Sequence, residues 1–229
     1  MATKSYTRAV GTKFHEDGQV RFFAGNTIVS HILENSHVFR EALWAQSEVM
    51  RLPFASKYAF LPPHSFHMTV FELLCDQVRD QQHWSSHLDL AIGLRETDVY
   101  FEKTATPIGP PSELQMRLSA VSTTRHAYIG LVPVNEKAEA RIRAYRDRLS
   151  ESTGVRFPNH DEYHYHISLA YMLEDLTEAE QEKGHAAEEA IETRLGRTLA
   201  EVTIPAPRVT YFDHMHAFHR DKVSTSRWP

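Results

Sequence analysis

The sequence predicts an α+β domain whose sheet is mainly antiparallel. Segments with the residue pattern of strands outnumber those with the pattern of helices, and most links between segments are short. The order strand, helix, strand, strand in the first half is followed by a similar set in the second half. A mixed order with short links is typical of α+β folds. The similarity of the two sets indicates an internal duplication.

In the first half, hydrophobic periodicity and turn residues predict five elements. They are a strand or hairpin at residues 19–32, a helix at 34–52, an extended segment at 58–61, a strand at 66–74 and a helix at 81–94. Ser36 is placed to cap the first helix. Pro53 ends that helix, because a proline disfavours helical geometry in the residue before it.

The second half has the same kinds of signal. It predicts strands at 113–122 and 127–134, a helix at 135–154, a strand at 163–173, a helix at 177–200 and a pair of strands at 208–212 and 215–218. Asn135 is a typical N-cap, Gly154 fits a helix end, and Thr177 and Glu180 have the spacing of a capping box. Four arginines of the helix at 135–154 are interpreted as a solvated face: Arg141, Arg143, Arg146 and Arg148.

The composition of the 229 residues excludes several classes of protein. The apolar runs are far shorter than the roughly 20 residues of a membrane helix, and residues 1–19 lack the apolar core of a signal peptide. The single cysteine, Cys75, cannot form an intramolecular disulfide, so we expect a reducing, cytoplasmic setting. The net charge of −5 argues against broad binding to long nucleic acids.

Histidine is unusually frequent, with 15 residues, so any pattern built on it needs support from its context. The pattern His-x-Ser/Thr occurs three times, where about two matches are expected by chance from the composition. The match at His83 lies in polar, helix-like sequence, and we set it aside. The other two begin at His67 and His166, at the centres of the two strongest predicted strands.

These two motifs each place a histidine and a hydroxyl side chain two residues apart. Thr69 follows His67, and Ser168 follows His166. On a strand, side chains at this spacing lie on one face, about 6.5–7 Å apart along the chain. A hydroxyl donates to a phosphoryl oxygen while an imidazole moves a proton, so these four residues favour a site for a phosphate group.

The segments FHMTVF and YHISLA, which contain the two motifs, resemble the paired His-x-Thr/Ser motifs of the two-histidine phosphoesterase superfamily. This group contains the bacterial RNA 2′,3′-cyclic phosphodiesterases, often called 2′-5′ RNA ligases. The resemblance implies a bilobal, pseudo-two-fold α+β fold, with mainly antiparallel sheets lining a central cleft and helices outside. Residues 1–229 would form one such domain, with the first motif in 19–112 and the second in 113–229.

The resemblance also implies phosphodiester hydrolysis without a metal or another cofactor. One of His67 and His166 takes a proton from the nucleophile, and the other gives a proton to the leaving ribose oxygen. Thr69 and Ser168 would hold the phosphoryl oxygens. The expected partner is a small nucleotide or an RNA end, rather than a membrane or a long nucleic acid.

Three further residues are candidates for contacts with the substrate. His164 has the spacing that shares a strand face with His166. Arg117 and Tyr128 lie on predicted strands that would border the cleft. A guanidinium group there would bind phosphate, and an aromatic ring would stack on a base.

Two other functions remain open from the sequence. Histidines at His-x-His spacing could ligate a metal in a metallohydrolase. The candidate ligands are His160, Asp161, Glu162, His164 and His166 in one group, and His214, His216 and His219 in another. A non-catalytic module that binds nucleotides could keep the same fold, although the presence of both complete motifs argues against an idle site.

Overall fold

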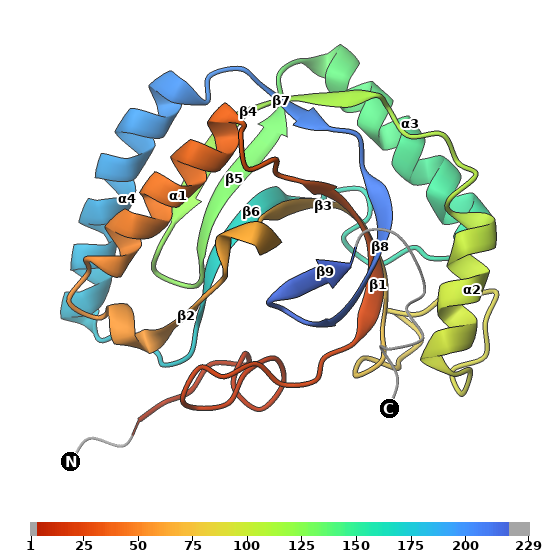
Figure 1. Cartoon of the computed structure of the whole chain (residues 1–229), viewed down its shortest axis with the longest axis horizontal. Helices are drawn as coiled ribbons and strands as arrows, with labels where there is room; N and C mark the ends of the chain where they lie inside the picture. Colours follow the sequence, from red (N-terminus) through yellow and green to blue (C-terminus); the bar gives the residue numbers. More distant parts are fainter. Residues whose placement is uncertain (1–3, 220–229) are drawn as a thin grey trace.

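A computed structural model describes residues 4–219 and shows a strongly curled sheet with helices along its outer side (Figure 1). The elements are β1 (Gly25–His31), α1 (His37–Met50), β2 (Tyr58–Phe60), β3 (His67–Cys75), α2 (Leu94–Thr104), β4 (Glu113–Ser122), β5 (Ala127–Pro133), α3 (Glu136–Thr153), β6 (Tyr165–Met172), α4 (Glu178–Thr198), β7 (Val202–Pro205), β8 (Arg208–His214) and β9 (Ala217–His219). Within the described residues, nine strands form one sheet in the order β7-β4-β5-β6-β3-β1-β8-β9, with β2 paired to β6. The pairings between these strands are antiparallel. The predicted α+β class is confirmed.

The chain builds this sheet from two related halves. In the first half, β1, α1, β3, α2 and β4 occur in this order, with β2 inserted before β3, and in the second, β5, α3, β6, α4 and β8 repeat this order, with β7 inserted before β8. The last strand of each half crosses to the other: β4 pairs with β5, and β8 pairs with β1. On the outer side α1 packs against α4 and α2 against α3. The pseudo-two-fold relation is therefore present in the topology.

The two halves meet where β3 lies beside β6, with Met68 opposite Ile167. Both side chains are fully buried. Because successive side chains on a strand point to opposite faces, the residues that flank this pair point the other way, into the concave side of the sheet. Those flanking residues are the histidines and hydroxyls of the two motifs.

Each motif strand has a β-bulge directly after its hydroxyl residue. On β3, the register against β1 shifts between Thr69 and Phe71. On β6, the register against β5 shifts between Ser168 and Ala170. A bulge adds one residue to one strand, so the alternation of faces is reversed beyond it.

Beyond each bulge, the residue five positions after the motif histidine points toward the concave side. Simple alternation would place Glu72 on the face of Met68, and Tyr171 on the face of Ile167. Both Glu72 and Tyr171 instead line the concave cavity. The extra residue on each strand therefore changes which side chains are available to the site.

A long side chain from a helix binds the backbone carbonyl at each bulge. Gln46 of α1 donates from Nε2 to the carbonyl oxygen of Leu169, at 2.9 Å. Arg146 of α3 donates from Nη1 to the carbonyl oxygen of Val70, at 2.6 Å. Each side chain also donates to a second carbonyl outside the motif strand, and both side chains are buried. Each helix thus supports the motif strand of the other half.

The predicted capping residues are confirmed. Ser36 and Asn135 each accept a hydrogen bond from the backbone N–H three residues further on. Thr177 and Glu180 form both bonds of a capping box. Gly154 ends α3 with a φ of 70°, a left-handed conformation that glycine adopts without strain. In the described part of the chain, no helix combines the length and the apolar character needed to cross a membrane.

Two expectations about helical residues were wrong. No helix was found over residues 81–93, which form turns and bends, and the helix of this region, α2, begins only at Leu94. Asp80 and Asp89 accept bonds from backbone N–H groups two or three residues further on, which stabilises turns in competition with a helix. Arg146 is not on a solvated face, because its bonds to two backbone carbonyls hold it in the interior.

We expect Arg146→Met to lower the free energy of unfolding by about 2–4 kcal/mol, because two buried carbonyl oxygens lose their donor. Gln46→Met should act in the same direction. Urea unfolding followed by circular dichroism measures both. The control is Arg143→Met, whose arginine is exposed and pairs with Glu139 on the helix surface; it should change stability by less than about 0.5 kcal/mol. Equal stability of the Arg146 and Arg143 variants would contradict the role of the buried donors.

Candidate active site

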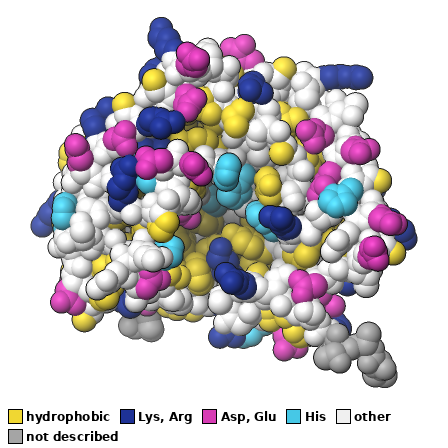
Figure 2. Space-filling view, turned by 180° about the vertical axis from the view of Figure 1, so that it is seen from behind, with side chains coloured by type: hydrophobic (Ala, Val, Ile, Leu, Met, Phe, Trp, Pro, Cys, Tyr) yellow, Lys and Arg dark blue, Asp and Glu magenta, His cyan; other side chains and the backbone are white. Residues whose placement is uncertain are grey.

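The concave side of the sheet encloses a cavity of about 600 Å³. Figure 2 shows a hollow in the centre of one face, where histidine side chains lie among hydrophobic ones. The four motif residues His67, Thr69, His166 and Ser168 all line the cavity. The fold therefore brings the predicted groups of both halves together around one space.

Both motif histidines are oriented by the backbone two residues before them. His67 Nδ1 lies 2.7 Å from the carbonyl oxygen of Ser65, and His166 Nδ1 lies 3.0 Å from that of His164. A carbonyl oxygen only accepts, so Nδ1 is the nitrogen that carries hydrogen. In the neutral ring, Nε2 then keeps a lone pair for proton transfer. In both halves, Nε2 is therefore the nitrogen that can exchange a proton with a substrate.

Burial favours the neutral form of both motif histidines. Desolvation lowers the pKa of His67 to about 4; the charge of His166 adds to this shift, and the bond to Ser65 opposes it. Burial also lowers the pKa of His166. A bound phosphate would act in the opposite sense, because a nearby negative charge stabilises an imidazolium ion.

Aromatic side chains enclose the two histidines. Phe218 of β9 packs on His67, with ring centroids 4.0 Å apart. Tyr128 of β5, a predicted contact of the substrate, packs edge-on to His166 with centroids 5.4 Å apart. These rings exclude water from the imidazoles, which explains why burial dominates the two pKa shifts.

The polar residues of the cavity that were not predicted from the sequence include Lys13, Glu72, His126 and Tyr171, and Asn26, Thr27, His83, Asn159 and Tyr163 also line it. The His126 ring lies 5.7 Å from that of His166 and 6.3 Å from that of Tyr171, and burial, with nearby positive charges, lowers its pKa to about 4. Glu72 and Tyr171 both follow a motif histidine by five residues, a spacing that simple alternation assigns to the opposite face, so the sequence pattern did not identify them. Lys13 and His126 lie outside the motifs and have no sequence signal.

Two of the predicted substrate contacts lie elsewhere. The side chains of His164 and Arg117 line a separate cavity of about 360 Å³ beside α3. Arg117 also lines a groove of about 800 Å³ between β4 and α4. His164 reaches the candidate active site through its backbone carbonyl, which binds His166.

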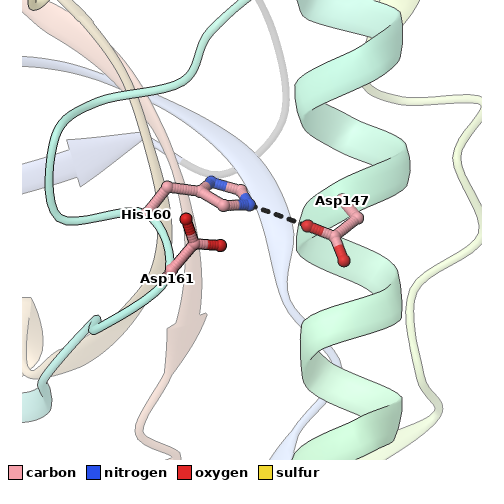
Figure 3. Close-up of side chains that lie close together, drawn as sticks. All are labelled: Asp147, His160 and Asp161. Atoms are coloured by element: carbon pink, nitrogen blue, oxygen red, sulfur yellow. Dashed lines mark hydrogen bonds and ion pairs between the residues drawn. The ribbon is translucent and has the colours of Figure 1, made fainter.

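Figure 3 shows a group of acidic and histidine side chains outside this cavity. His160 Nε2 lies 2.9 Å from Asp147 Oδ1, and Asp161 lies beside them, with potential ligand atoms within 4.8 Å of one another. In residues 4–219 this is the only group of three that is this close. Arg156 binds both carboxylates, at 3.7 Å from Asp147 and 2.8 Å from Asp161. With both carboxylates paired to Arg156, the group is an ion-pair network in which exposed carboxylates surround the buried His160.

Of the metal ligands considered from the sequence, His160 and Asp161 lie together in this group with Asp147, and the other candidates complete no comparable group in the described residues. His166 lines the candidate active site, whereas the side chain of His164 lines the separate cavity. The rings of His214 and His216 are 6.3 Å apart, and the His216 N–H donates to His214 Nδ1. The side chain of His219 lies outside the described residues.

The sequence matches the family model described as "2H-phosphodiest: Domain of unknown function (DUF1868)" over residues 13–127, half of the chain. The matched part contains the first motif and its bulge, and it ends before the second motif. No protein with a curated description matches the sequence.

Solved structures with a similar fold include the conserved protein of unknown function ATU0111 from Agrobacterium tumefaciens str. C58. It has a TM-score of 0.88 and 22% sequence identity, covering 96% of this chain and 94% of that chain. TT0787 of Thermus thermophilus has a TM-score of 0.46 and 15% identity, covering 81% and 86%. A phosphoesterase has a TM-score of 0.47 and 10% identity, covering 87% and 95%. The Agrobacterium protein shares the fold of this chain over nearly its whole length.

We expect the protein to lose stability as the pH falls from about 6.5 to about 4. His67 and His126 have pKa values of about 4 in the folded protein, below the 6.5 of an exposed histidine. The unfolded chain binds more protons in this window, so acidification favours unfolding. Urea unfolding at several pH values measures the slope. The double variant His67→Asn/His126→Asn should have a smaller slope between these pH values, and a slope equal to that of the wild type would contradict the shifts.

Proposed function

Because this chain belongs to the 2H-phosphodiest family of the two-histidine phosphoesterase superfamily, we propose that it hydrolyses a cyclic phosphate or phosphodiester of a nucleotide or an RNA end. One observation carries the proposal: two histidine–hydroxyl pairs from the two halves line one cavity, with both imidazoles oriented through Nδ1. This arrangement supports general acid/base catalysis by His67 and His166, with Thr69 and Ser168 as donors to the phosphoryl oxygens.

In the proposed reaction, water attacks the phosphorus atom in line with the leaving ribose oxygen. Nε2 of one motif histidine accepts a proton from the water as the new P–O bond forms. The other motif histidine, protonated at Nε2, donates its proton to the ribose oxygen as the old P–O bond breaks. The product is a phosphomonoester, and the two histidines have exchanged protonation states; solvent then restores them.

The electrostatics of the cavity support one acid and one base. A bound phosphate anion raises the pKa of the nearby imidazoles, while the mutual repulsion that lowers the pKa of His67 disfavours protonation of both rings. Glu72 acts in favour of protonation at His166, because its negative charge raises the pKa of that ring against the effect of burial. We therefore assign His166 as the acid and His67 as the base for hydrolysis.

The size and lining of the cavity support a small nucleotide or the end of an RNA chain. A volume of about 600 Å³ lies in the range of small-molecule sites. Phe23, Phe157 and Phe212 also line it, and aromatic rings of this kind stack on bases. A phosphate alone would leave most of this space empty.

Turnover of 2′,3′-cyclic nucleotides, measured with and without EDTA, tests the proposal. We expect the wild type to be active in both conditions. His67→Asn and His166→Asn should each lower kcat by about 10²–10⁴-fold, because each removes one proton transfer. Thr69→Val and Ser168→Ala should lower it by about 10²–10³-fold, because each removes a donor to the phosphoryl group.

The matched control is His185→Asn, because this histidine lies on α4 and is largely exposed. It should keep wild-type activity. Unchanged activity of both motif-histidine variants would refute the assignment. Activity that is lost in EDTA and restored by a metal ion would favour a metallohydrolase, and binding of the nucleotide without turnover of a broad set of phosphodiesters would favour a non-catalytic module.

A further inference from the structure

Residues 4–20 form a segment, the N-terminal strap, that is bound at the end of β6. The Thr7 N–H donates to the carbonyl oxygen of Leu173 at 2.9 Å, and the Asp175 N–H donates to that of Ser5 at 2.8 Å. Phe14 of the strap is fully buried. In Figure 1 the strap passes along the lower edge of the curled sheet. These contacts fix the strap to the second half of the molecule.

The strap carries Lys13 into the candidate active site. Lys13 Nζ lies 3.3 Å from the hydroxyl oxygen of Tyr171 and 4.6 Å from the centroid of its ring. The same nitrogen lies 5.3 Å from the centroid of the Phe23 ring. The carbonyl oxygen of Lys13 accepts a bond from the Arg21 N–H at 2.9 Å. Both the backbone and the side chain of Lys13 are therefore held in place.

Lys13 is the only lysine or arginine that lines this cavity in the part of the chain that is described. Burial lowers its pKa, but Tyr171, Cys75 and Glu72 together raise it, and the pKa lies above its ordinary value. The ammonium group is therefore charged at pH 7. The negative charge of Glu72, which also lines the cavity, raises the pKa of Lys13. Among residues 4–219, however, no carboxylate lies within ion-pair distance of Lys13. Its charge is available to a ligand.

The ammonium group lies to one side of the motif pair. Tyr171, to which Lys13 is bonded, is three residues beyond Ser168, or about 10 Å along β6. The His126 ring lies near both strand positions, 5.7 Å from the ring of His166 and 6.3 Å from that of Tyr171. A phosphate held by both motifs would therefore leave Lys13 facing a neighbouring group of the same ligand.

We propose that Lys13, with Tyr171 and His126 beside it, forms a second anion subsite, and that the preferred substrates carry a second phosphate near the one that reacts. This inference rests on the proposed function, because it takes the space between the motifs as the place of the reacting phosphate. The chemical class is a nucleoside cyclic phosphate that also has a 5′-phosphate. An ammonium ion inside a cavity attracts such a group strongly, and a phenol and an imidazole supply further donors to its oxygens.

Calorimetric titration at pH 7 with adenosine 3′,5′-bisphosphate and adenosine 3′-monophosphate tests the subsite. The wild type should bind the bisphosphate about tenfold or more tightly, the effect of one hydrogen bond to a charged group. Lys13→Met should remove this preference, and Lys13→Arg, which keeps the charge, should retain it. The control is Lys4→Met, which removes a strap cation that pairs with Glu174 outside the cavity; it should keep the preference.

Equal affinity of the wild type for the two ligands would overturn the proposal. So would a Lys13→Met variant that loses affinity for both ligands alike, because Lys13 would then bind the reacting phosphate. Turnover of adenosine 2′,3′-cyclic phosphate, with and without a 5′-phosphate, is measured in parallel. A wild type that prefers the bisphosphate but turns over neither cyclic phosphate would support the subsite and refute the hydrolase.

Discussion

The candidate site depends on how β3 and β6 meet. The two strands are paired at one set of buried residues, and directly beyond each hydroxyl of the motifs a bulge interrupts the regular ladder. Buried donors bind the carbonyls there: Arg146 binds Val70, and Gln46 binds Leu169. Each donor belongs to the other half of the molecule. Neither motif therefore reaches its geometry alone. The packing of the two halves is the constraint that sets the geometry of the site.

The same constraint makes the cavity symmetric at its centre and asymmetric around it. At the centre, each imidazole is held by the carbonyl two residues before it, so the chain presents two equivalent proton carriers. Beyond the bulges, equivalent positions hold Glu72 and Tyr171, an anion and a phenol. The strap adds Lys13 on the side of Tyr171 only. The two halves of the cavity thus differ chemically at three side chains: Glu72, Tyr171 and Lys13.

Sequence patterns predicted the parts of the structure that depend on local interactions. The caps at Ser36 and Asn135 and the four motif residues lie where periodicity and spacing placed them, and the four meet in one cavity. Prediction failed where contacts between distant chain segments determine the position of a side chain. Arg146 has the same kind of sequence neighbours as the exposed arginines of α3, and only its contact with β3 distinguishes it. A bulge reverses the faces of a strand without altering its residue pattern, so Tyr171 was missed, and Lys13 enters the cavity only because the strap is bound elsewhere.

Asymmetry also explains how two like histidines could take different roles. In an exactly symmetric cavity, burial would lower both pKa values alike, and a bound phosphate would have no preference for protonating one ring. Glu72 removes that equality, because its charge raises the pKa of His166 and is no cause of the shift at His67. Lys13 opposes Glu72 at His166, because its positive charge lowers the pKa of that ring. A phosphate bound beside the ammonium would neutralise this opposition, so a doubly charged ligand would favour the protonated form of the proposed acid more than a singly charged one.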